Sequence, residues 1–155
     1  MSQDAISNDD VIDTLNTLIE TCKDGEYGFR TSAERVKSAQ LRQVFSSRAE
    51  ECRQGGTELQ TIVTRLGGKA ETSSSATGTL HRGWVKLKEA ISGNPDLAAL
   101  EECERGEDAA LARYRDAIKQ TLPSDVAAVV QRQYEGVKRN HDQIRSLRDQ
   151  MRSTA

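Results

Sequence analysis

The 155-residue sequence has few aromatic residues, only two prolines and no long apolar run. Aromatic residues make up 4% of the chain, whereas charged residues make up 30% and carry both signs. With few helix breakers and many Ala, Leu, Glu, Lys and Arg residues, this composition is typical of a soluble helical protein. The apolar runs are too short for a transmembrane helix, so we expect no membrane association. The segment MSQDAISNDD lacks the basic start and apolar stretch of a signal peptide, and we therefore expect a cytoplasmic protein.

The sequence also lacks a charge excess and the common catalytic motifs. A formal net charge of −2 gives no general electrostatic reason to expect nucleic-acid binding. There is no phosphate-binding loop, Cys-x-x-Cys pair, nucleophile elbow or His-Glu-x-x-His motif, and no catalytic residue is predicted. Three cysteines, Cys22, Cys52 and Cys103, lie on or beside apolar stripes, where we expect buried, reduced thiols.

Apolar residues recur every three or four positions in four long segments, and this spacing predicts helices. The predicted helices cover about residues 8–37, 39–66, 95–121 and 124–152. A shorter helix is expected near residues 77–91, with Trp84 buried against the bundle. We therefore expect one all-α domain over residues 1–155, with a connecting segment at about residues 67–95.

Charged residues occupy positions in these stripes where apolar residues belong. Glu104 and Glu107 fall within the stripe of the third long helix, and Arg48 falls within the stripe of the second. Glu26 and His141 lie at the edges of the stripes on the first and last helices. Because a buried charge is costly unless it is paired, neutralised or bound to a metal, this pattern predicts a polar layer inside the bundle.

The positions of the charged residues favour one connectivity of the bundle. At a rise of about 1.5 Å per residue, Glu26, Arg48 and Glu104 reach one height only if the two hairpin turns lie at opposite ends. The connection between the hairpins must then cross the length of the bundle, which is a known bundle connectivity. In this arrangement the charges can neutralise one another, so we expect Arg48 to contact Glu26, Glu104 or Glu107.

Four segments resemble an uncharacterised bacterial family of four-helix-bundle proteins with a ferritin-like fold. These segments are LIETCKDGEYGFRTSAE, GTLHRGWVKLKEAISG, ECERGEDAALARY and VKRNHDQIRSLRD. The resemblance covers nearly the whole chain and implies a ferritin-like bundle with a helical crossover connection.

The wider ferritin-like group, which includes rubrerythrin-like proteins, holds two metal ions between four helices. Two helices each supply one Glu, and the other two each supply a Glu-x-x-His pair. Glu26 resembles the first-helix ligand and Glu107 the third-helix ligand. However, Cys52 and Gly55 stand where the second helix should supply Glu and His, and Lys138 stands where the last helix should supply Glu. The resemblance therefore implies a degenerate or absent di-metal centre.

Three interpretations of the polar layer stay open at this point. It is a salt-bridge cluster around Arg48, a pocket for a small ligand, or a site for a single iron, manganese or zinc ion. The candidate metal ligands are Glu26, Glu104, Glu107 and His141. The corresponding functions are a binding, interaction or stress-related role or, alternatively, a metal-dependent oxidase or peroxidase with unusual ligands. A structural module that forms homo-oligomers is a further alternative.

Overall fold

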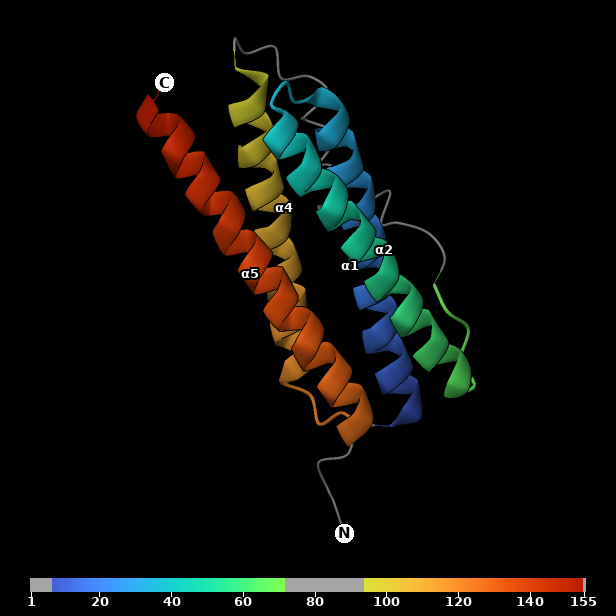
Figure 1. Cartoon of the computed structure of the whole chain (residues 1–155). Coiled ribbons are helices and arrows are strands. Elements are labelled where there is room, and N and C mark those ends of the chain that lie inside the picture. The colour runs from blue at the N-terminus through green and yellow to red at the C-terminus, as the bar shows by residue number, and fades with distance from the viewer. Residues whose placement is uncertain (1–6, 72–93, 155) are drawn as a thin grey trace.

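The computed structural model describes residues 7–71 and 94–154, which form a bundle of four long helices (Figure 1). The helices are α1 (Asn8–Arg35), α2 (Ala39–Arg65), α4 (Pro95–Ile118) and α5 (Ser124–Thr154). The four predicted long helices are confirmed, and each observed end lies within one turn of the predicted end. No helix in this part of the chain is both long enough and apolar enough to span a bilayer. The short helix predicted near residues 77–91, with Trp84, lies outside the described residues.

Local sequence signals set the helix ends. The hydroxyls of Ser7 and Ser38 accept hydrogen bonds from backbone N–H groups in the first turns of α1 and α2, at 3.1 and 3.2 Å. Asn94 caps α4 in the same way, and Pro95 follows in the first turn, where a backbone N–H is not needed. After α2, Gly67 has a φ of 85°, a left-handed conformation that glycine adopts without steric cost. The helix boundaries are therefore encoded by residues close to them in sequence.

The predicted crossover is confirmed by contacts at the two ends of the bundle. At one end, the Asp96 carboxylate near the start of α4 accepts hydrogen bonds from the backbone N–H groups of Lys37 and Ser38, at 2.6 and 3.1 Å. At the other end, the Thr14 hydroxyl near the start of α1 donates to Gln120, just after α4, at 2.7 Å. The turn after α1 and the turn after α4 thus lie at opposite ends, and α4 runs in the same direction as α2 (Figure 1).

Buried apolar side chains form two clusters along the bundle. One cluster includes Leu15, Leu59 and Val130, and the other includes Phe29 and Phe45, whose ring centroids lie 6.1 Å apart. Along α4, the fully buried Glu107 lies between Cys103 of one cluster and Ala110 of the other. A buried charge therefore interrupts the apolar core at this level of the bundle.

Near the middle of the bundle, α1 and α2 approach closely because glycines face cysteines across their contact. A Cβ atom at Gly25 would lie 2.8 Å from Cys52 Sγ, and one at Gly56 would lie 3.3 Å from Cys22 Cβ. The first separation is shorter than any normal contact, so a larger residue at Gly25 would push the two helices apart or displace the thiol.

Candidate functional site

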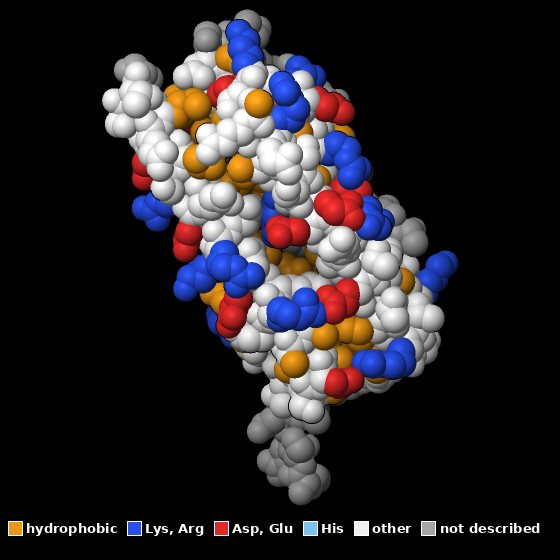
Figure 2. Space-filling model, viewed as in Figure 1, with side chains coloured by type: hydrophobic (Ala, Val, Ile, Leu, Met, Phe, Trp, Pro, Cys, Tyr) orange, Lys and Arg blue, Asp and Glu red, His pale blue; other side chains and the backbone are white. Residues whose placement is uncertain are grey.

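A cleft opens between the α1–α2 pair and the α4–α5 pair, where α2 faces α5. These two helices pack less closely than the other neighbouring pairs, and the cleft has a volume of about 990 Å³. Figure 2 shows it as a hollow near the middle of this face, with apolar atoms at its floor and charged side chains around it. Clefts of this size commonly hold small molecules, so this cleft is the candidate functional site.

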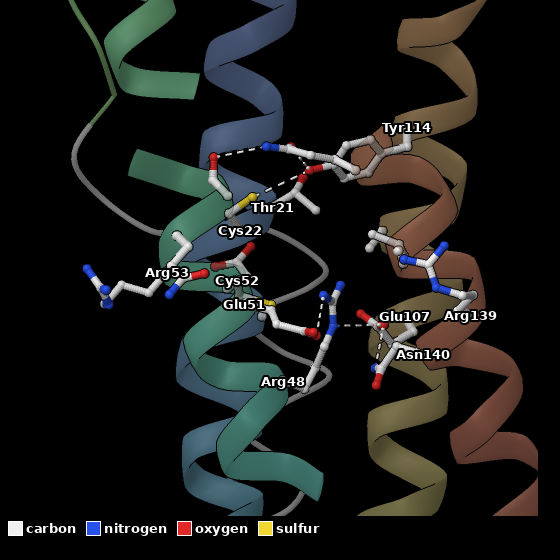
Figure 3. Close-up of a pocket in the computed structure, with 18 of the residues that line it drawn as sticks. Thr21, Cys22, Arg48, Glu51, Cys52, Arg53, Glu107, Tyr114, Arg139 and Asn140 are labelled. Atoms are coloured by element: carbon white, nitrogen blue, oxygen red, sulfur yellow. Dashed lines mark hydrogen bonds and ion pairs between the residues drawn. The ribbon is translucent and has the colours of Figure 1, made fainter. Parts of the chain in front are cut away.

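Arg48 of α2 is buried at this cleft, with 8% of its surface exposed. Its Nε atom lies 3.4 Å from Glu107 Oε2 of α4, and its Nη1 atom donates to Glu51 Oε1 at 3.3 Å. The guanidinium carbon also lies 5.9 Å from the centre of the Phe29 ring, within the range of a cation–π contact. Figure 3 shows the guanidinium group pointing from α2 into the space between the helix pairs, towards Glu107. A positive charge is thereby fixed near the centre of the bundle.

Glu107 is the acidic partner of Arg48 and is 2% exposed. Asn140 Nδ2 of α5 donates to its Oε2 atom at 2.8 Å. Burial raises the pKa of Glu107, while the charge of Arg48 and the Asn140 hydrogen bond lower it and oppose this rise. The carboxylate is therefore costly to keep ionised, and Arg48 offsets part of that cost.

A second polar network spans the cleft at the level of Tyr114. The Tyr114 hydroxyl donates to Gln133 Oε1 of α5 at 2.8 Å and lies 3.5 Å from Cys22 Sγ. Gln133 Nε2 donates to the Gly55 carbonyl at 3.3 Å and to the Glu58 carboxylate at 2.9 Å, both on α2. A single amide side chain thus satisfies a buried hydroxyl and links α5 to α2.

The three cysteines are buried and free, as the sequence predicts. Cys22 and Cys52 border the cleft, and Cys103 Sγ lies 3.2 Å from the Ser32 hydroxyl. Burial raises the pKa of all three thiols, which keeps them protonated at neutral pH. Cys22 and Cys52 therefore contribute uncharged, weakly polar surface to the wall of the cleft.

The structure does not bring the four predicted metal ligands together. Glu26 is half-buried and pairs with Arg30 on its own helix at 3.0 Å. Glu104 pairs with Arg148 of α5, and Glu107 contacts Arg48 and Asn140. His141 Nε2 lies 2.7 Å from Asp108 Oδ1, and its Nδ1 lies 3.2 Å from Asp142 Oδ1. The expected single layer is thus divided among four local groups, because each side chain has a closer partner of its own.

The central residues do not fit the ligand set of a di-metal centre. Residues 7–71 and 94–154 contain no group of three or more His, Cys, Asp or Glu side chains arranged to hold a metal ion. On α2, Arg48 contacts Glu107, and Cys52 and Gly55 line the same cleft. Lys138, at the position where the last helix should supply Glu, is exposed. A fixed guanidinium charge beside Glu107 repels divalent cations from that carboxylate.

Tyr114, Gln133 and Asn140 line the cleft, although the sequence did not predict a role for them. The available signal lay in α5, where Gln133 and Asn140 stand seven residues apart in an otherwise apolar stripe. Polar residues at such positions need buried partners, and here the partners are Tyr114 and Glu107 of α4. Their spacing could have predicted polar contacts, but it could not identify the partners on other helices.

Comparison with solved structures shows the ferritin-like fold. The chain is similar to a two-domain protein from Anabaena variabilis with DJ-1/ThiJ/PfpI-like and ferritin-like domains, with a TM-score of 0.76 and 14% identity. That match covers 97% of this chain but only 39% of the two-domain protein. A dodecameric thioferritin, the bacterioferritin-related protein from Bacteroides fragilis, matches with a TM-score of 0.73 and 16% identity, over 98% of this chain and 94% of that one.

Comparison with sequences is consistent with the expected uncharacterised ferritin-like family. No curated protein matches the chain. The model of one family, described as a domain of unknown function (DUF2383), matches residues 10–120. The match covers nearly all of α1 and the whole of α2 and α4, and it ends before α5 begins. Because it covers well over half of the sequence, the chain belongs to the DUF2383 family.

Proposed function

We propose that this protein is a binding protein that has the ferritin-like fold without a di-metal centre. The observation that carries the proposal is the Arg48–Glu107 contact at 3.4 Å, with both residues buried. In a di-metal bundle, carboxylates at this level neutralise metal ions. Here a guanidinium group neutralises the central carboxylate, and the neighbouring cleft offers space for a ligand.

The other predicted metal ligands support the same proposal. Arg30, Arg148 and Arg48 each hold one of the carboxylates, so a metal ion would have to displace three arginine contacts. A single iron, manganese or zinc ion would further require Glu26, Glu104, Glu107 and His141 to leave their partners and converge. Such rearrangements are expensive where the groups are buried, because each displaced charge loses its compensation.

The test is metal content after purification without a chelator or an affinity-tag metal. We expect less than one iron, manganese or zinc ion per chain, and a melting temperature that is unchanged by a chelator. Reconstitution with ferrous iron should produce no ferroxidase or peroxidase activity.

Two iron ions per chain, with activity lost in Glu107→Ala, would overturn the proposal and favour the oxidase or peroxidase alternative. One tightly bound ion per chain that is lost in the same variant would also overturn it and support a single-metal site. Glu101→Ala is the matched control, because Glu101 is a half-buried carboxylate on α4 that pairs with Arg152 away from the cleft.

A further inference from the structure

We propose that the cleft between α2 and α5 binds a small organic anion, a carboxylate attached to an apolar body, and that Arg48 recognises the carboxylate. This inference rests on the proposed binding function and names its ligand class. Three features support it: the buried Nε donor of Arg48 that makes no hydrogen bond, the mixed surface of the cleft, and the pairing of the charges at its rim.

The guanidinium group of Arg48 has unused hydrogen-bonding capacity. Its Nη1 atom donates to Glu51, whereas its Nε atom is buried and makes no hydrogen bond within the described residues. The 3.4 Å contact between Nε and Glu107 is an ion pair without good hydrogen-bond geometry. Arginine binds carboxylates best through two parallel N–H groups, and the edge that contains Nε is suited to this mode. A ligand carboxylate would therefore satisfy a donor that the protein leaves unsatisfied.

The surface around Arg48 suits an apolar ligand body rather than a bare inorganic ion. Ala110, Val137, Cys22 and Cys52 line the cleft with apolar atoms and protonated thiols. The lining also includes one glycine from each of the four helices, Gly25, Gly55, Gly106 and Gly136. A Cβ at Gly136 would have only Arg139 Nη2 near it, at 3.7 Å, so this wall of the cleft borders open space. A volume of about 990 Å³ is more than an inorganic anion can fill.

The remaining charges at the cleft are balanced and largely paired. Four arginines and four acidic residues line it. At the rim, Arg53 pairs with Glu50 and Arg132 pairs with Glu58. Arg48 is the one arginine or lysine that is buried in the described part of the chain. Arg139 also lines the cleft, but it is exposed, and water and salt screen its charge. The buried Arg48 is therefore the cation best placed to hold an anion inside the cleft, and Glu107 is the group with which the ligand competes.

Because the ligand competes with Glu107 for Arg48, substitutions of these two residues should change ligand affinity in opposite directions. Removal of the guanidinium group should weaken binding, whereas removal of the Glu107 charge should strengthen it. A third change can block the cleft without altering any charge, because Gly136 borders the open space from α5.

The experiment measures binding of hexanoate to the full-length protein by isothermal titration calorimetry. 1-Hexanol serves as the neutral counterpart, and inorganic phosphate as the anion without an apolar body. We expect hexanoate to bind about tenfold more tightly than 1-hexanol, a difference of about 1.4 kcal/mol, because only the carboxylate can accept charge-assisted hydrogen bonds from Arg48. Phosphate should bind more weakly than hexanoate.

Variants then test whether hexanoate binds in this cleft. Arg48→Met should weaken hexanoate binding about tenfold or more, and Glu107→Gln should strengthen it several-fold. Gly136→Leu should weaken it by filling the cleft. Arg65→Met should leave it unchanged, because Arg65 is an arginine of α2 that pairs with Asp125 away from the cleft.

Equal affinities for hexanoate and 1-hexanol, or affinities unchanged in both Glu107→Gln and Gly136→Leu, would overturn the inference. These two variants keep the test decisive if Arg48→Met fails to fold. Absence of hexanoate binding in protein with substoichiometric metal would refute the ligand class alone. Two bound iron ions would instead refute the proposed function itself.

Discussion

The two sides of α2 use glycine in opposite ways. On the side of α1, Gly25 faces Cys52 so closely that an added Cβ would lie 2.8 Å from the sulfur. On the side of α5, Gly136 borders the cleft, and an added Cβ would meet only Arg139 Nη2, at 3.7 Å. The same residue type permits close packing at one contact and leaves space at the other. A glycine within a helix must therefore be interpreted from the neighbour that it faces.

The largest expected effect comes from removing the positive charge of Arg48 at the cleft. Arg48→Met should lower the free energy of unfolding by about 3–5 kcal/mol at neutral pH, because Glu107 would stay buried without its cation. Urea denaturation monitored by circular dichroism measures the change. Arg53→Met is the control, since Arg53 is an exposed rim residue that pairs with Glu50.

The destabilisation of Arg48→Met should shrink as the pH falls. The pKa of Glu107 is already raised by burial above the ordinary value of 4.5, and loss of Arg48 should raise it further. A raised pKa in the folded state means that protonation of Glu107 stabilises the fold. This stabilisation is complete below about pH 4.5 and is lost as the pH rises through the folded-state pKa. A destabilisation independent of pH would contradict the charge-compensation account.

A smaller effect is expected at the contact between α1 and α2. Gly25→Ala should destabilise the protein by about 1–2 kcal/mol, because overpacking against Cys52 costs more than the gain in helix propensity. Adding Cys52→Ala should recover part of this loss, because it removes the sulfur that the new Cβ meets. Gly136→Ala, at the cleft, should instead be neutral or stabilise by up to about 1 kcal/mol. Equal effects of the two alanine substitutions on the melting temperature would remove the contrast between the two sides.

The smallest effect concerns the polar network that spans the cleft. Tyr114→Phe should cost about 1 kcal/mol, because the hydroxyl loses its hydrogen bond to Gln133 while the ring keeps its packing. Tyr134→Phe is the control, because Tyr134 is a half-buried tyrosine of α5 that packs against the apolar cluster and lies outside the Tyr114 network. If both substitutions have the same effect in thermal denaturation, the Tyr114 network does not stabilise the cleft.

The fold could be predicted largely from the sequence because its signals are local or periodic. Capping residues such as Ser38 and Asn94 set the helix ends, and the apolar stripes set the buried faces. The heights of Glu26, Arg48 and Glu104 led to the correct crossover connectivity. Of the contacts between charged residues that favoured this topology, the one between Arg48 and Glu107 is formed.

The site could be predicted only in part because height does not specify the direction in which a side chain points. Glu104 and Glu107 lie one turn apart on α4, yet Glu104 pairs with Arg148 of α5 and Glu107 contacts Arg48 of α2. Glu26, at the edge of its stripe, pairs with Arg30 on its own helix. The cleft itself had no sequence signal, since it results from the looser packing of α2 against α5.

The hydrogen bonds of the Asp96 carboxylate determine how strongly the length of the crossover connection affects stability. It joins α4 to backbone groups that lie 58 and 59 residues earlier in the sequence. The entropic cost of closing a loop grows only with the logarithm of its length, so lengthening the crossover connection adds little to the cost of holding its far end. Two hydrogen bonds to one charged side chain hold that end beside the turn between α1 and α2. The connection can therefore vary in length with little effect on stability, while the docking of the two hairpins stays fixed.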